Sequence, residues 1–169
     1  MEGAVNAHGG ETPARAQCLA AVDVFVIAGG LGTRIGSVLG NTPKLLARIG
    51  GRPYLAYLLD WLRRFGAKRI VLGLGHQAQA VVDFLDRDKA AGDGLEIVPV
   101  IEPRPLGTAG AIRFARGNLR SDPVLIMNGD SFADADLCAF GDVSDASRKV
   151  CHFDSDHYSA RGNGNSVAF

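Results

Sequence analysis

The chain has 169 residues, 47% of them hydrophobic, which is a length and composition typical of one globular domain with a sizeable core. Its 18 basic and 18 acidic residues give a formal net charge of zero, so there is no electrostatic case for binding nucleic acid or an anionic membrane. No apolar stretch approaches the length of a membrane span. Any bound anion must therefore be held by a local site.

The three cysteines, Cys18, Cys138 and Cys151, are odd in number and form no CxxC pair. This pattern predicts neither a disulfide framework nor a zinc site. We therefore expect a protein of the reducing cytoplasm. Residues 1–20 contain Pro13, several glycines and only short apolar patches, and we expect them to form a flexible extension.

From residue 22 onward, apolar runs alternate with segments of helical periodicity. The expected elements are a strand over 22–28, a short extended piece over 45–49, a helix from about Pro53 to Gly66, a strand over 69–74, a helix over 77–85, a strand over 95–101, a helix over 108–116 and a strand over 124–127. Such repeated strand–helix–strand units predict a three-layer α/β domain with a mainly parallel sheet. Ligands of these sheets bind beyond the carboxyl ends of the strands.

The last segment of the chain departs from this pattern. Residues 141–169 contain no Leu, Ile, Met or Trp, and no period of two or 3.6 persists. By composition we expect loop or disorder there. Residues 21–140 are then the folded core, followed by an irregular tail over 141–169.

The first expected strand is followed by a glycine-rich segment that contains Gly29, Gly30, Gly32, Thr33 and Arg34. Glycines let the backbone approach phosphates closely and present its N–H groups to them. The segment therefore predicts a polyphosphate site rather than a plain turn. It is not a Walker loop, because no Gly-Lys-Ser/Thr closes it, and its glycine spacing is one residue too long for a dinucleotide fingerprint.

Lys44 and Asp130 join Arg34 to complete the predicted phosphate site. Lys44 directly follows Pro43, whose fixed φ orients it, and we expect Lys44 and Arg34 to contact phosphates rather than to be solvated surface charges. Asp130 follows a strand, where it either caps the next helix, with Ser131 as a competitor, or holds Mg²⁺. Opposite a polyphosphate loop we favour Mg²⁺, which takes hard oxygen ligands.

The loops after the second and third expected strands offer contacts for a base. In the segment Leu106–Gly110, Gly107 allows close backbone approach to a flat base, and Thr108 is a candidate cap of the following helix; these two interpretations are compatible. Gln77 has a side-chain amide suited to a base edge. All these loops follow strand ends, so the sheet would bring them to one edge.

In order and spacing, these motifs resemble those of the sugar-phosphate nucleotidyltransferases over about residues 22–140. The matching segments are 28–34, 43–44, 105–111 and 128–130. The resemblance implies a Rossmann-like nucleotide-binding fold that takes a nucleoside triphosphate, a sugar 1-phosphate and Mg²⁺, and that releases pyrophosphate.

The resemblance also implies a role for each matching residue. Gly30, Gly32 and Thr33 would lie along the phosphates, next to Gly29. Arg34 and Lys44 would be the catalytic pair that stabilises charge at the α-phosphate and the departing pyrophosphate. Gly107 and Thr108 would face the base with Gln77 as a neighbour, and Asp130 would hold Mg²⁺.

Within the family, residues 102–112 and 127–132 look most like heptose 1-phosphate guanylyltransferases, which favours GTP and heptose 1-phosphate as substrates. Mannose-1-phosphate guanylyltransferases and N-acetylmuramate-1-phosphate uridylyltransferases stay open. The family's acceptor-sugar segments and second Mg²⁺-binding Asp find no match after about Phe140. A truncated remnant that binds nucleotide without turnover is therefore the alternative, and the oligomeric state is left open.

Overall fold

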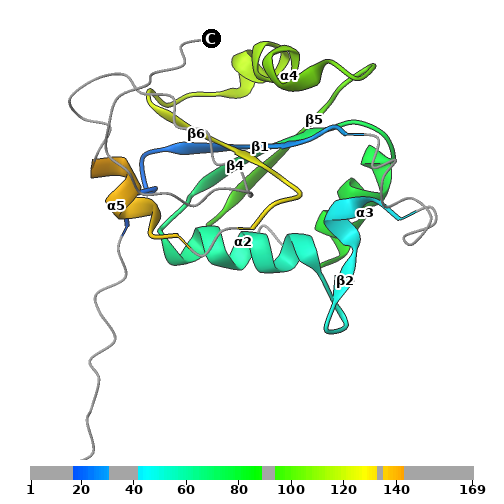
Figure 1. The fold of residues 1–169 in the computed structure, drawn as a ribbon, viewed down its shortest axis with the longest axis horizontal. Coiled ribbons are helices and arrows are strands. Elements are labelled where there is room, and N and C mark those ends of the chain that lie inside the picture. Colours follow the sequence, from blue (N-terminus) through cyan, green and yellow to red (C-terminus); the bar gives the residue numbers. More distant parts are fainter. Residues whose placement is uncertain (1–16, 31–41, 89–93, 133–134, 143–169) are drawn as a thin grey trace, which may run out of the picture.

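The computed structural model describes residues 17–30, 42–88, 94–132 and 135–142. Within these ranges the central sheet has four parallel strands in the order β5-β4-β1-β6 (Figure 1). Its strands are β1 (Asp23–Ala28), β4 (Arg69–Leu74), β5 (Glu96–Ile101) and β6 (Val124–Asn128). The helices are α2 (Tyr54–Arg64), α3 (Ala78–Asp88), α4 (Gly107–Ala115) and α5 (Leu137–Asp142). The predicted α/β fold with a mainly parallel sheet is confirmed.

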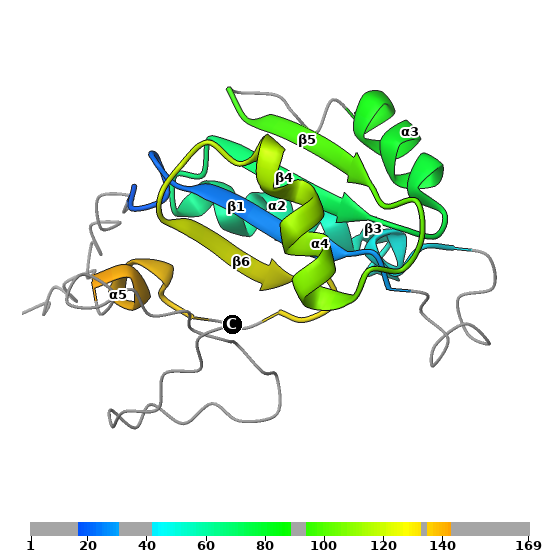
Figure 2. The same cartoon turned by 90° about the horizontal axis from the view of Figure 1, so that it is seen from above.

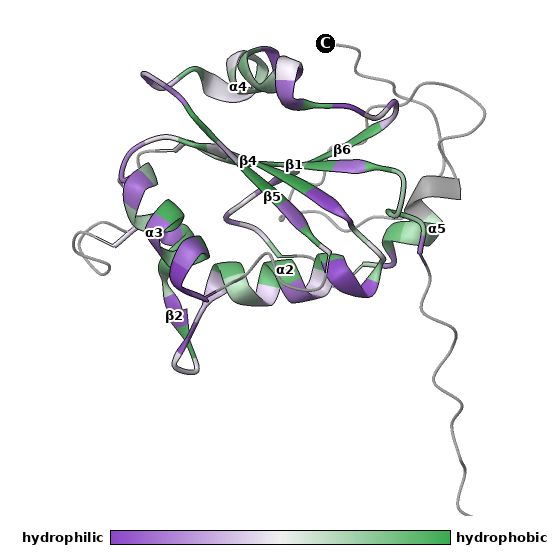
Figure 3. Ribbon diagram, turned by 180° about the vertical axis from the view of Figure 1, so that it is seen from behind, coloured by the Kyte–Doolittle hydropathy of each residue, from purple (hydrophilic) through white to green (hydrophobic). Residues whose placement is uncertain are grey.

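The helices cover both faces of the sheet, as Figures 1 and 2 show. Successive side chains of β1 point to opposite faces of the sheet. Val24 and Val26 belong to a core cluster with the inner faces of α2 and α3, whereas Phe25 packs with Val71 and Ala111 beneath α4. Because β1 is buried on both sides, its sequence is apolar almost throughout, and Figure 3 shows mainly hydrophobic residues along β1 and β4.

The α2 helix contributes the largest apolar stripe. Leu55, Leu58, Leu59 and Leu62 are at most 1% exposed and follow helical spacing. Burying each leucine contributes about 1.5–3 kcal/mol. The helix begins directly after the Arg52–Pro53 strand β3 and ends before Gly66, whose φ of 84° is in the left-handed region.

A buried ion-pair network closes the sheet at the amino ends of the strands. Arg69 donates to the Asp23 carboxylate at 3.2 Å, and the backbone N–H groups of Arg120 and Ser121 donate to the same carboxylate oxygen at 2.6 and 3.3 Å. Arg69 also donates to Glu96 at 3.0 Å. The partners satisfy the buried charges, so this edge has a structural role and leaves the carboxyl edge for a ligand.

Several element boundaries differ from those expected. The expected extended piece over 45–49 is instead a 3-10 turn, η1 (Lys44–Leu46), followed by β2 (Arg48–Ile49), which pairs antiparallel with β3. Leu45 is buried by this turn, so its apolar character reflects core packing rather than a strand. A further 3-10 turn, η2 (Arg116–Asn118), extends α4, and α5 was not expected at all.

The two ends of the predicted core are packed where the structure describes them. Leu19 is 5% exposed, and its N–H donates to the Phe65 carbonyl at 3.0 Å, so the described end of the expected extension lies against α2. At the other end, α5 runs to Asp142, and residues 143–169 lie outside the described residues.

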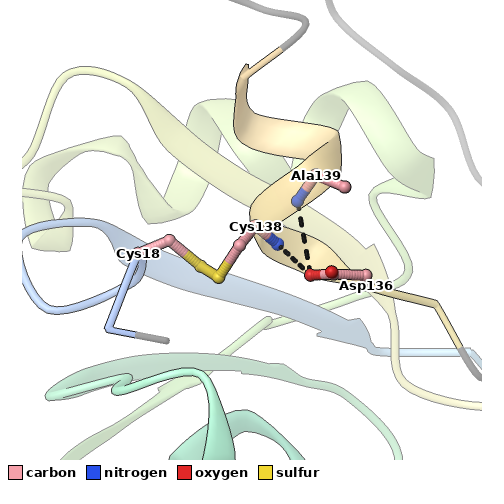
Figure 4. The surroundings of a disulfide bond; sticks show 4 residues. All are labelled: Cys18, Asp136, Cys138 and Ala139. Carbon is pink, nitrogen blue, oxygen red and sulfur yellow. Dashed lines mark hydrogen bonds between the residues drawn. A yellow bond between two sulfur atoms is a disulfide. The ribbon is translucent and has the colours of Figure 1, made fainter. Parts of the chain in front are cut away.

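A disulfide joins these two ends, contrary to the prediction from cysteine spacing. Cys18 and Cys138 have Cα atoms 5.4 Å apart and are bonded across 120 positions of sequence (Figure 4). The prediction was wrong because spacing along the chain does not reveal which cysteines the fold brings together. The bond ties the segment before β1 to α5.

We expect Cys18→Ser to lower the free energy of unfolding by about 2–5 kcal/mol, because the cross-link restricts the unfolded chain over a long loop. Urea unfolding without reductant measures this, with Cys151→Ser as the matched control because it keeps both bridging cysteines. Equal stability of Cys18→Ser and the unsubstituted chain, or three titratable thiols in the native, non-reduced protein, would contradict the bond.

Candidate functional site

The ends of the four parallel strands lie at one edge of the sheet, as predicted. Leu74, at the end of β4, is in register with both Ala28 of β1 and Ile101 of β5. The next residue after β5, Glu102, donates its N–H to the Leu74 carbonyl at 2.7 Å. The N–H of Gly129, after β6, donates to the β1 carbonyl of Ile27 at 2.8 Å. The loops selected from the sequence therefore begin side by side.

Two of the predicted site residues form an ion pair at this edge. Lys44 Nζ lies 3.1 Å from Asp130 Oδ2, although the residues are 86 positions apart. The side chains are 31% and 53% exposed, so both can be reached from solvent. The structure thus brings the predicted phosphate-binding cation and the predicted metal-binding carboxylate to one point.

Asp130 does not cap a helix. The next helix in the described part of the chain is α5, which begins seven residues later at Leu137. Its first turn is capped by Asp136, whose carboxylate accepts from the N–H groups of Cys138 and Ala139 at 2.9 and 3.3 Å (Figure 4). The capping alternative for Asp130 is therefore wrong, and its half-exposed carboxylate is available to a ligand.

The turn that carries Asp130 is held by α2. Tyr54, at the start of the helix, donates its hydroxyl to the carbonyl of Ser131 at 2.9 Å. Further along α2, the Trp61 ring contacts Phe132 with ring centroids 5.2 Å apart. Burial, and secondarily the negative charge of Asp130, raises the pKa of Tyr54 to about 12. The hydroxyl therefore stays protonated and keeps donating even at pH 10, where the pKa of an ordinary tyrosine lies.

In the predicted base-binding loop, Gly107 has a φ of 68°, which is in the left-handed region, so any side chain there would strain the backbone. The α4 helix already begins at Gly107, and its N-cap position, Leu106, makes no side-chain cap. Thr108 is therefore an exposed residue within the first turn, and the prediction that it caps the helix is wrong.

The remaining predicted residues are placed as follows. Gly29 is buried and Gly30 exposed directly after β1. Gln77 lies in the turn between β4 and α3 with a φ of 60°, which is uncommon for a residue other than glycine. Gly32, Thr33 and Arg34 lie outside the described residues, and their roles stay predictions.

Two residues of this edge had been given no role from the sequence, namely Tyr54 and Glu102. Tyr54 gave no signal, because a tyrosine at the start of an amphipathic helix is ordinary. Glu102 did give a signal, because it is an acidic residue placed directly after an apolar run. In the structure its side chain is only 8% exposed. A buried acid needs a partner, so such a position marks a specific contact.

Residues 24–140 match the family model of the MobA-like NTP transferase domain, which is more than half of the chain. The chain belongs to this family. The resemblance of its motifs to nucleotidyltransferases is thereby confirmed.

Relatives of this NTP transferase domain include nucleotidyltransferases of sugar phosphates. It is 31% identical over 116 residues to the D-glycero-alpha-D-manno-heptose 1-phosphate guanylyltransferase of Campylobacter jejuni, covering 69% of this chain and 51% of the relative. It is 35% identical over 127 residues to the mannose-1-phosphate guanylyltransferase of Mycobacterium tuberculosis, covering 75% of this chain and 35% of that protein. The domain thus spans about half, or less, of the length of these relatives.

The fold of the NTP transferase domain also resembles a solved structure. HddC from Yersinia pseudotuberculosis, crystallised in complex with GMP-PN, superposes with a TM-score of 0.67 at 35% identity, covering 74% of this chain and 55% of that one. Separately, none of the helices in the described ranges is both long and apolar enough to cross a lipid bilayer.

We expect Tyr54→Phe to destabilise the domain by about 1 kcal/mol at pH 8, because the Ser131 carbonyl loses its donor. The pKa of Tyr54 is raised from 10.0 to about 12 in the folded state, so its stabilising contribution is complete below pH 10 and is lost as the pH rises towards 12. The difference between the unsubstituted chain and Tyr54→Phe should therefore shrink over that range.

Urea unfolding at several pH values between 8 and 11.5 measures this difference. Tyr57→Phe is the matched control, since it removes a hydroxyl that donates to the Ile49 carbonyl on the surface. A stability difference for Tyr54→Phe that stays constant across the range would contradict the assignment.

Proposed function

We propose that this domain transfers a nucleotidyl group from a nucleoside triphosphate to a sugar 1-phosphate, releasing pyrophosphate, in the synthesis of nucleotide-sugars. The main support is the pairing of Lys44 with Asp130 at 3.1 Å at the carboxyl edge of the sheet. Asp130 directly follows Gly129, whose N–H donates to the carbonyl of Ile27 near the end of β1. A cation suited to phosphate and a carboxylate suited to Mg²⁺, close together where α/β domains bind their ligands, support the proposal.

In this reaction the protein needs only to align the two substrates and to stabilise the negative charge of the phosphates. The phosphate oxygen of the sugar 1-phosphate is already ionised at neutral pH, so no general base is required. It bonds to the α-phosphorus as the bond from that phosphorus to the β-phosphate oxygen breaks, and pyrophosphate leaves. Lys44 and Arg34 would stabilise the negative charge that builds on the transferred and departing phosphates.

The residues of this edge fit Mg²⁺. Mg²⁺ keeps several waters and is usually bound through one or two carboxylates together with substrate phosphates. Asp130 supplies such a carboxylate, and its side chain is 53% exposed. In the described part of the chain no cluster of three or more His, Cys, Asp or Glu is present. When bound, Mg²⁺ would offset phosphate charge.

For the substrates we favour GTP and heptose 1-phosphate. The relatives include a heptose 1-phosphate guanylyltransferase and a mannose-1-phosphate guanylyltransferase, and HddC was crystallised with GMP-PN. Gly107, Thr108 and Gln77 would lie around the base. Mannose 1-phosphate with GTP, and N-acetylmuramate 1-phosphate with UTP, are the competing pairs.

We place the reaction in the cytoplasm, where nucleoside triphosphates are abundant. The disulfide between Cys18 and Cys138 is the observation that weighs against this location, because disulfides are rare in reducing compartments. Thiol titration of protein isolated under alkylating conditions decides whether the bond exists in the cell.

We expect Lys44→Ala and Arg34→Ala each to weaken triphosphate binding by roughly 1.5–3 kcal/mol, because each removes a charge-assisted contact. Calorimetric titration with GTP and Mg²⁺ measures the affinity. Lys68→Ala is the matched control, since Lys68 is an exposed lysine next to the amino end of β4. Unchanged affinity in both site variants would refute the phosphate assignment.

For Asp130→Asn we expect weaker binding of GTP in the presence of Mg²⁺ and nearly unchanged binding in its absence. The substitution removes the charge that attracts the metal but keeps the shape of the side chain. It also releases Lys44 from its ion partner, so metal-free binding should not weaken. Equal losses with and without Mg²⁺ would show that Asp130 acts other than through the metal.

The activity itself is tested by measuring pyrophosphate release with GTP, UTP, CTP and dTTP against heptose, mannose and N-acetylmuramate 1-phosphates. We expect GTP with heptose 1-phosphate to give the fastest release, and Lys44→Ala to abolish it. Tight GTP binding without release from any pair would instead support the non-catalytic alternative. Neither binding nor release would refute the proposed function.

A further inference from the structure

Glu102 is a buried acid at the carboxyl edge of the sheet that the proposed chemistry does not use. It is 8% exposed and follows the last residue of β5. Its Oε2 accepts a hydrogen bond from the backbone N–H of Leu106 at 3.2 Å. Leu106 is the N-cap position of α4, so the carboxylate lies at the positive end of that helix. The side chain thereby fixes the loop that leads to Gly107.

The same carboxylate lies against the beginning of the glycine-rich loop. A Cβ atom added to Gly29 would lie 2.8 Å from Glu102 Oε1 and 3.0 Å from Oε2. Because β4 separates β5 from β1 in the sheet, the side chain reaches across the end of β4. Gly75 follows β4 there, and a Cβ at that position would collide with the Gly29 carbonyl. The glycine at 29 thus leaves the space in which the carboxylate sits, and the glycine at 75 lets the backbone of Gly29 pass close to the end of β4.

We infer that Glu102 is a positioning residue that sets the spacing between the phosphate-binding loop at Gly29 and the base-binding loop at Gly107. A nucleotide must contact both loops at once, so their separation decides how well the two contacts can be made together. A carboxylate that contacts one loop and accepts a hydrogen bond from the other fixes that separation before the ligand arrives. The inference rests on the proposed nucleotide site.

Loss of this side chain should weaken binding of a ligand that contacts both loops more than binding of a ligand that contacts the phosphate loop alone. For Glu102→Ala we expect the affinity for GTP to fall at least tenfold and the affinity for tripolyphosphate, which needs only the phosphate loop, to change less than threefold. Glu102→Gln should bind GTP within about threefold of the unsubstituted chain, because its amide oxygen still accepts the Leu106 N–H. Ser121→Ala, which removes a hydrogen-bonding hydroxyl at the opposite edge, is the control for nonspecific weakening.

A double-mutant cycle tests the contact without any ligand. Gly29→Ala should lower the melting temperature of the otherwise unsubstituted chain, because the new methyl group meets the held carboxylate. In the Glu102→Ala background the same substitution should cost clearly less, since the carboxylate is gone. Non-additivity of this sign is expected for residues in contact.

The outcomes separate the inference from the function on which it rests. Parallel losses for GTP and tripolyphosphate in Glu102→Ala, failure of Glu102→Gln to restore binding, or additive melting shifts in the cycle would each overturn the positioning role. Absence of GTP and tripolyphosphate binding by the unsubstituted chain would refute the proposed function, and with it the nucleotide-positioning role, even if the cycle shows that Glu102 and Gly29 are in contact.

Discussion

The parallel pairing of β1 with a strand on each side is the constraint on which the rest of the structure depends. Val26 is in register with Leu72 of β4 and with Met127 of β6, so three strands end at nearly the same level. This alignment is stabilised by burial of β1 on both faces, with Val24, Phe25 and Val26 fully buried. Strand pairing alone therefore brings the first residues of loops that are far apart in sequence together at the carboxyl edge.

The two edges of the sheet perform different tasks. At the amino edge, Asp23 and Arg69 neutralise one another while buried, and backbone N–H groups complete the hydrogen bonding. At the carboxyl edge, Lys44 and Asp130 are paired but partly exposed. A buried, fully bonded pair resists exchange of partners, whereas an exposed pair exchanges them at little cost. Only the second arrangement is suited to receiving phosphates and a metal ion.

The α2 helix links the hydrophobic core to the candidate site. Its leucines anchor it beneath the sheet, and the chain that leaves the Asp130 turn returns along it, first at Tyr54 and then at Trp61. The returning chain ends at α5, where Cys138 is bonded to Cys18. Contacts with α2 thus hold the residues that directly follow Asp130, while β6 and the ion pair to Lys44 hold Asp130 itself.

The sequence predicted those parts of the fold that depend on local pattern. The strand over 69–74 has the predicted bounds, because a buried strand is a short apolar run, and α2 follows from leucine periodicity. Covalent bonds and ion pairs between side chains distant in sequence could not be predicted. The Cys18–Cys138 bond spans 120 positions and the Lys44–Asp130 pair 86, and no period in the sequence encodes such separations.

The same limit explains the errors and omissions at the site. Thr108 is a residue type that often caps helices, but α4 begins one residue before it, at Gly107. The left-handed φ of Gly107 is imposed by the three-dimensional course of the loop, which no local pattern reveals. The sequence shows Glu102 as an acidic residue next to a predicted strand, but its contact with Gly29 depends on the strand order β5-β4-β1. Strand order is a property of the whole sheet and not of any segment.

The proposed function requires that one nucleotide is held by loops from the ends of all four described strands of the parallel sheet. The most direct measurement is an amide NMR titration of the isotope-labelled chain with GTP and Mg²⁺. We predict shifts at Gly29, Gln77, Gly107 and Asp130, one in the loop after each strand, and none at Asp23 or Ser121, which lie at the opposite edge. Shifts confined to a single loop, shifts at the amino edge, or none at saturating GTP would contradict the account.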